Sequence, residues 1–169
     1  MSLLDLLRDE RDELARARRI DGVAIGIVTN NQDPDGMGRV KLKFPWLSEE
    51  NESDWARVAT VMAGPNRGSY FLPEVDDEVL VAFDHGEIHH PYVIGALWNG
   101  QDKPPETNSD GKNNIRKIRS RSGHEIVLDD NSEQKKEKVT IQTNAGHQIV
   151  LDDSAGQEKS VSHQQVLRP

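Results

Sequence analysis

Histidines and clustered carboxylates are the side chains of this 169-residue chain that could bind a metal ion or transfer a proton. His124 and His147 stand at equivalent places in two similar segments, so a symmetric assembly would gather copies of each. Packing or surface roles are favoured over metal binding for both. Glu74 and the acids at 76–78 lie in an expected turn with no pocket motif nearby, which indicates a solvated acidic turn and not a catalytic carboxylate pair.

The other patterns that could support chemistry also point to structure. The chain has no cysteine, which excludes Cys nucleophiles, Cys-based metal sites and disulfide bonds. Asp129-Asp130 and Asp152-Asp153 are interpreted as turns whose side chains cap backbone amides, in preference to calcium sites. His89-His90 is expected in a loop, and no Ser/His/Asp arrangement, phosphate loop or dinucleotide motif occurs. The sequence thus predicts no catalytic residue, no cofactor and no metal centre.

Residues 1–20 are predicted to form a helix. Ser2 and Asp5 have the spacing of a capping box, and Leu3, Leu7 and Leu14 lie on a narrow apolar stripe. Two interpretations stay open: the helix packs on its own domain, or it docks on other subunits. Charged residues interrupt these leucines at once, so no signal-peptide core is present and we expect synthesis in the cytoplasm.

Residues 21–103 are predicted to form one small β domain. Val40, Leu42 and Phe44 alternate with basic residues, which is the pattern of a half-buried strand. The turn Asp33-Pro34-Asp35-Gly36 separates the first two strands. Five short strands with an irregular third connection favour a closed Greek-key barrel of the OB type. The expected strands are 22–30, 37–44, 55–63, 78–84 and 91–98.

The charge of the chain is concentrated in this predicted barrel. Residues 21–103 contain six basic and fourteen acidic side chains, which accounts for the whole net charge of −8. The alternative function of such a barrel is single-stranded nucleic-acid binding, which needs a basic groove with stacking aromatic rings. An acidic barrel and only eight aromatic side chains in the chain argue against it, and we expect no nucleic-acid partner.

A linker is predicted at 104–117, where Pro104-Pro105 is followed by nine residues without an apolar side chain. Two copies of a repeat follow in 118–169. The octapeptide GHEIVLDD at 123–130 returns as GHQIVLDD at 146–153, 23 residues later. A repeat of this length indicates stacked units of two strands each, which cannot bury their apolar faces alone.

The repeats predict an oligomer. Their strands carry few apolar side chains and have no second sheet or covering helix, which is too little buried surface to offset an ordering cost of about 1–2 kcal/mol per residue. Copies that intertwine would bury their apolar faces on a common axis, and three chains make the simplest prism. Val127 and Val150 are expected nearer the surface. The expected core of this trimer is Ile118, Ile126, Leu128, Val139, Ile141, Ile149 and Leu151.

Several motifs in the chain carry a family resemblance. They are DPDGMGRVKLKFPW (33–46), SDWARV (53–58), MAGP (62–65), FLPEV (71–75), DEVLVAF (77–83), His85-Gly86 and PYVIGALWNG (91–100). Together they resemble the OB domain of the phage baseplate assembly protein V and VgrG family, and the resemblance spans about residues 20–155. Members of this family are the central spikes of contractile tails, type VI secretion systems and extracellular injection systems.

The resemblance implies a mainly β homotrimer with an N-terminal helix, a five-stranded OB-fold barrel and an intertwined trimeric β-helix or β-prism shaft. It implies a structural central spike, seated on a hub protein at the end of an inner tube, that carries a PAAR-type tip protein or cargo. Leu3, Leu7 and Leu14 would then contact the hub or other baseplate components, and a target membrane would be met only transiently, during puncture. The family's large hub domains and lysozyme-like insert are missing here, so a separate hub and a non-enzymatic shaft are expected. The particle would be phage-tail-like, either virion-like or an extracellular or cell-anchored injection system.

Overall fold

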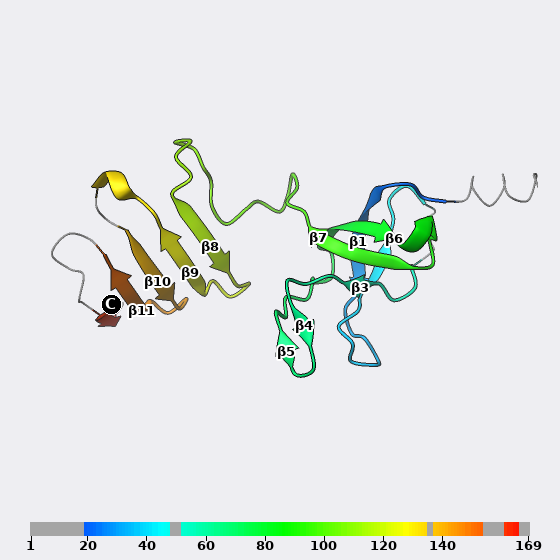
Figure 1. Cartoon of the computed structure of the whole chain (residues 1–169), viewed down its shortest axis with the longest axis horizontal. Helices are drawn as coiled ribbons and strands as arrows, with labels where there is room; N and C mark the ends of the chain where they lie inside the picture. The colour runs from blue at the N-terminus through cyan, green and yellow to red at the C-terminus, as the bar shows by residue number, and fades with distance from the viewer. Residues whose placement is uncertain (1–18, 48–51, 135–136, 154–160, 166–169) are drawn as a thin grey trace, which may run out of the picture. The chain divides into compact units, whose positions relative to one another are not determined.

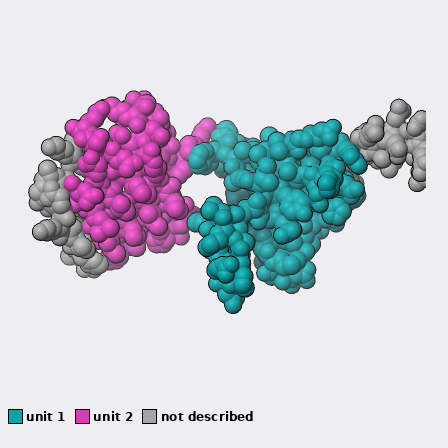
Figure 2. Space-filling view, in the orientation of Figure 1, with its two compact units in different colours: residues 1–102 teal, residues 103–169 magenta. Residues whose placement is uncertain are grey.

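The computed structural model describes residues 19–47, 52–134, 137–153 and 161–165. These parts of the chain are almost entirely β, with two single-turn 3-10 segments, η1 (Asp84–Gly86) and η2 (Ser132–Gln134). The chain divides into two compact units, residues 1–102 and 103–169 (Figure 2). Within the described parts, no helix has the length and apolar character needed to cross a membrane. The helix predicted at 1–20 lies almost wholly outside the described residues.

The first unit is a five-stranded sheet closed on itself (Figure 1). Its neighbouring strands are antiparallel except β3, which runs parallel to β7. Backbone hydrogen bonds of 3.0 and 2.8 Å between Val40 and Ala56 join the two ends of the sheet and close it. This is the predicted barrel. In sheet order its strands are β2 (Lys41–Lys43), β1 (Val23–Asn30), β6 (Glu78–Phe83), β7 (Pro91–Ala96) and β3 (Arg57–Val58).

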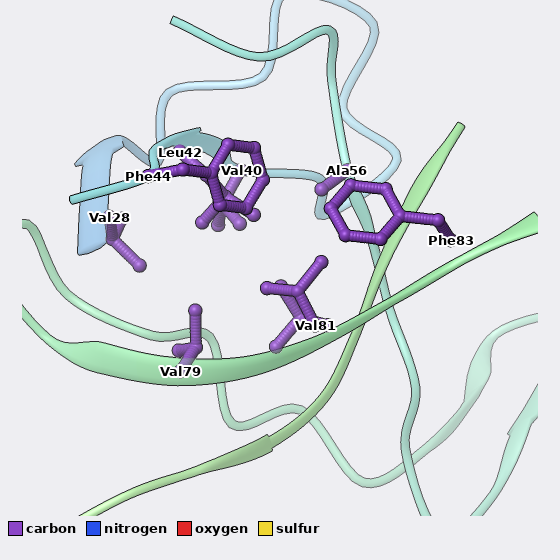
Figure 3. Close-up of a cluster of buried hydrophobic side chains, with 9 residues drawn as sticks. Val28, Val40, Leu42, Phe44, Ala56, Val79, Val81 and Phe83 are labelled. Atoms are coloured by element: carbon purple, nitrogen blue, oxygen red, sulfur yellow. The ribbon is translucent and has the colours of Figure 1, made fainter. Parts of the chain in front are cut away.

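The barrel core follows from the period-two pattern of the strands. Val79, Val81 and Phe83 of β6 point inward and are buried. Gly26 of β1 also faces the interior, where an added Cβ would lie 3.2 Å from a methyl group of Val81. The buried side chains gather in one cluster (Figure 3), which comprises Val28, Val40, Leu42, Phe44, Ala56, Val79, Val81, Phe83 and Val93.

Two predicted strands are shorter than expected. The strand predicted at 37–44 is regular only at Lys41–Lys43, because Gly38 adopts a positive φ of 69° in the loop before it. The strand predicted at 55–63 is regular only at Arg57–Val58. After Val58 the chain leaves the barrel and forms a separate hairpin of β4 (Ala63–Gly64) and β5 (Arg67–Gly68) (Figure 1).

The second unit is an antiparallel meander in which each strand pairs with its neighbours in sequence. Its first strand begins at Ile115, so the last three residues of the expected linker belong to the sheet. The strands pair within the chain, so their backbone pairing does not require a second copy. They are β8 (Ile115–Arg119), β9 (Glu125–Asp129), β10 (Lys138–Gln142), β11 (His147–Asp152) and β12 (Val161–Gln165).

Both repeats use the same turn. Gly123 and Gly146 have positive φ angles of 86° and 89°, and their N–H groups donate to the carbonyls of Ser120 and Thr143, at 2.9 Å in each case. The hydroxyl groups of Ser120 and Thr143 then accept from the N–H of the following histidine, at 3.0 and 3.1 Å. A hydroxyl residue three positions before a glycine is therefore part of the repeat, and it sets the direction of each following strand.

Candidate assembly surfaces

All seven residues expected in the trimer core lie on one face of the second sheet. Residues directly opposite each other on paired antiparallel strands share a face. The register aligns Ile118, Ile126, Ile141 and Ile149 in one row across β8–β11. A second row consists of Leu128, Val139 and Leu151. We call these seven side chains the apolar face.

The apolar face is uncovered in the single chain. Six of its seven residues are exposed, from 40% for Ile126 to 52% for Ile118. A contiguous apolar surface of this kind marks an interaction site in a soluble protein. His124 shares the parity of Ile126 and lies at the end of this face, where its Nδ1 accepts a hydrogen bond of 3.2 Å from the Asn144 N–H.

The opposite face of the same sheet is polar. Arg119 and Lys117 both pair with Glu125, at 2.7 and 3.8 Å, and the Gln148 amide donates to the Gln142 side chain at 2.8 Å. Val127 and Val150 lie on this side by strand parity and are half-buried. Such cross-strand polar pairs suit a surface that stays in water.

The linker is fastened to this polar face. Lys117 forms an ion pair of 3.1 Å with Glu106. The Thr107 N–H, and after it the Lys117 ammonium group, lower the pKa of the Glu106 carboxyl group. Further along, Lys112 pairs with Glu133 at 2.5 Å, and the pKa of Lys112 is raised by that carboxylate. The first contact joins Glu106 to the sheet and the second joins Lys112 to the η2 segment, although composition alone predicts a free linker.

The remaining sequence candidates lie apart from one another. Asp129 accepts from the Asn131 N–H at 3.2 Å and Asp77 from the Glu74 N–H at 2.8 Å, which are turn contacts. His89 faces Asp54 at 3.1 Å on the surface. Within the described parts of the chain, no group of three or more His, Asp or Glu residues is arranged to hold a metal ion. The contact residues expected in the N-terminal helix, Leu3, Leu7 and Leu14, lie outside the described residues.

A second apolar surface, which the sequence analysis missed, lies on the first unit. A groove of about 690 Å³ runs between the loop at 36–38 and the β4–β5 hairpin. Four exposed large apolar side chains line it: Met37, Met62, Tyr70 and Phe71. The signal was present in the sequence as two apolar clusters, 61–63 and 70–72, on either side of a glycine-rich turn. They do not alternate, so no strand period reveals them.

One wall of this groove is held by a carboxylate clamp. The buried Asp33 side chain binds the Arg39 guanidinium group through both oxygens, at 2.6 and 2.9 Å. It also accepts from the N–H groups of Asp35, Met37 and Arg39 itself. The Arg39 guanidinium group, followed by these backbone donors, holds the pKa of Asp33 far below its usual range. The loop that carries Met37 is therefore set before any partner binds.

Comparison with known proteins supports an OB fold for the barrel. Residues 24–98 match the family model of the type VI secretion system and phage-baseplate injector OB domain. The type VI secretion system spike protein VgrG3 of Vibrio cholerae is 35% identical over 102 residues, which cover 56% of this chain and 10% of that protein. Spike protein VgrG1a of Pseudomonas aeruginosa is 36% identical over 94 residues, covering 53% and 15%. Spike protein VgrG2a of the same species is 31% identical over 125 residues, covering 66% and 15%.

The barrel is thus an injector OB domain of the kind found in phage baseplates and type VI secretion systems. Over the part that matches, the chain is similar to the VgrG spike proteins of type VI secretion systems. It spans between 10 and 15% of the length of these curated relatives.

Proposed function

We propose that this protein is the structural, homotrimeric central spike of a contractile injection system. The observation that carries the proposal is the apolar face of the second unit. Its seven side chains form two rows on one side of the sheet, and Arg116 of β8 ends the second row opposite Leu128. The other side carries ion pairs and amide contacts. The polar side of the sheet is suited to solvent, whereas the apolar side needs a partner surface to cover it.

Three copies suit this face. Three sheets can enclose a triangular prism with their apolar faces inward and their polar faces outward. Each copy then buries surface at a gain of about 25 cal/mol per Å², which an isolated sheet cannot obtain. Two sheets packed face to face would also cover the apolar rows, so the number of copies separates the proposed spike from a simple dimer. The similarity to type VI secretion system spike proteins favours the prism.

The rest of the proposal follows from the likeness to spike proteins. The barrel end sits on a hub protein at the end of an inner tube and contacts baseplate components, with Leu3, Leu7 and Leu14 as contact residues. The shaft end carries a PAAR-type tip protein or cargo and meets the target membrane only during puncture. The role is mechanical and needs neither a cofactor nor a catalytic residue. The protein is made in the cytoplasm and assembled into a phage-tail-like particle.

The mass of the protein in solution tests the oligomer. We expect three copies of the 19.0 kDa chain, stable to dilution into the nanomolar range, in sedimentation velocity and light scattering. A mass of one or two copies refutes the trimeric spike. A pull-down with a hub protein encoded by the same injection system then tests the seat of the spike, with a hub from an unrelated system as the control.

A further inference from the structure

Strands β1 and β6 of the barrel are apolar on both faces. The inner face supplies Val79 and Val81 to the core. On the outer face the register places Val23 opposite Ala82 and Ile25 opposite Leu80. Strands that are apolar on both sides are typical of sheets covered on both sides. The outer side is nevertheless open here, with Val23 exposed by 55% and Ile25 by 44%. We call Val23, Ile25, Leu80 and Ala82 the outer patch.

Unlike the outer patch, which is part of the barrel wall, the β4–β5 hairpin projects from the barrel (Figures 1 and 2). Every residue from 59 to 68 is exposed, and Val61 is exposed by 96%. The hairpin is held by its own hydrogen bonds, which include Thr60 Oγ1 to the Ser69 carbonyl at 2.6 Å and the Ser69 N–H to the Met62 carbonyl at 3.0 Å. An ordered projection with apolar side chains and little contact with its own barrel is suited to a partner.

A ring of three identical subunits needs two different surfaces on each copy. Around a three-fold axis the contacts are head-to-tail, so each copy presents one surface and receives the other. The first unit has one projecting apolar surface and one flat apolar surface. We propose that the hairpin side chains Val61 and Met62 of one copy pack on the outer patch of the next copy. This inference rests on the proposed homotrimer and assigns the residues that join its three barrels.

The charges near the two surfaces are complementary. Arg67, at the tip of the hairpin, lines the groove and makes no ion pair with any residue that the structure describes. Glu78 extends the outer face of β6 beyond Leu80, opposite Ile27. Its carboxylate accepts a hydrogen bond of 3.4 Å from the Asn99 amide and has no ion pair among the described residues. An Arg on the projecting surface and a carboxylate beside the receiving one favour the same pairing.

Disulfide trapping between two different variants tests the pairing. The chain has no cysteine, so each introduced thiol is unique. Val61→Cys and Ile25→Cys chains are co-expressed in the full-length protein and oxidised mildly. A disulfide between positions 61 and 25 can then form only between copies. Both sites are exposed, so the substitutions leave the barrel core intact. The matched control co-expresses Val61→Cys with Val75→Cys, a residue exposed by 49% outside both surfaces.

The expected result is a covalent dimer linked through 61 and 25, identified by peptide mass and formed roughly a thousandfold faster than in the control pair. The ratio reflects millimolar effective concentration within a trimer against micromolar concentration between particles. If the noncovalent mass is three copies but the 61–25 link forms no faster than the control, the pairing is wrong while the trimer stands. Rapid linkage of Val61→Cys to itself would place the hairpins together on the axis and would also overturn the pairing. A single-copy mass before oxidation would remove the proposed trimer itself.

Discussion

Replacing Ile126 by Asp should dissociate the proposed trimer. Ile126 lies in the middle of the isoleucine row, directly opposite Ile118 and Ile141 on the neighbouring strands. A carboxylate there would replace a methyl-bearing side chain on each of three copies at the same height along the axis. Because 40% of Ile126 is exposed in the single chain, the effect of the substitution should appear mainly in the association of copies.

The size of the effect follows from the exposed fraction. Burying a whole Ile side chain contributes about 1.5–3 kcal/mol, and 40% of Ile126 remains to be buried. Three copies therefore lose roughly 2–4 kcal/mol of hydrophobic stabilisation. Since 1.4 kcal/mol is a factor of ten, the trimer weakens by roughly 30- to 700-fold from this loss alone. Three carboxylates without partners weaken it further, by about 3–5 kcal/mol for each one left buried.

Sedimentation velocity at micromolar concentration should therefore show three copies for the parent chain and one copy for Ile126→Asp. The matched control is Val127→Asp, which adds the same charge one residue away on the polar face, opposite Thr140 and Lys117. A carboxylate there meets an ammonium group, so three copies should persist. The assignment of the faces fails if Ile126→Asp remains a trimer, or if Val127→Asp dissociates to the same extent.

Two further predictions concern the loops around the groove. Asp33→Asn should lower the melting temperature by several degrees at neutral pH. The pKa of Asp33 in the folded chain lies below its unfolded value near 3.9. The difference in melting temperature between the variant and the parent chain should therefore narrow as the pH falls through and below that value. An undiminished gap at acid pH would count against the clamp. Gly68→Ala should speed amide exchange in the hairpin about tenfold or more, because its Cβ would lie 2.5 Å from the Met62 carbonyl oxygen at a φ of 150°. Gly64→Ala, which meets only the flexible Arg67 side chain, is the control, and equal exchange in both variants would contradict the steric argument.

The sequence predicts those parts of the fold whose side chains alternate. The run 78–83 alternates inward and outward within a closed barrel, so its strand and its buried residues follow from period two. The repeated octapeptide likewise predicts both the strands and the face of Ile126 and Ile149. Each of these residues gains its environment from neighbours two positions away in sequence or directly across a strand, which a pattern can represent.

The features that were missed depend on contacts over longer separations. Residues 37–39 leave the expected strand because the Asp33 side chain binds backbone N–H groups four and six residues later. The periodicity of apolar residues does not reveal such a contact. Ile115 joins the sheet because it pairs with Asp129, although its polar neighbours resemble a linker. The hairpin gives no strand signal, because its glycines and proline are turn formers and its apolar side chains make little contact with their own barrel. A surface that serves another molecule leaves little trace in intrachain patterns.

The shared register of β9, β10 and β11 has a consequence for how such a shaft can change over time. Ile126, Ile141 and Ile149 occupy one row and Leu128, Val139 and Leu151 the other, and each turn is rebuilt by the same hydroxyl and glycine pair. Duplicating one 23-residue unit would therefore extend both rows without altering any existing pairing. The shaft would then change in length by whole repeats, while the contacts between copies stay the same.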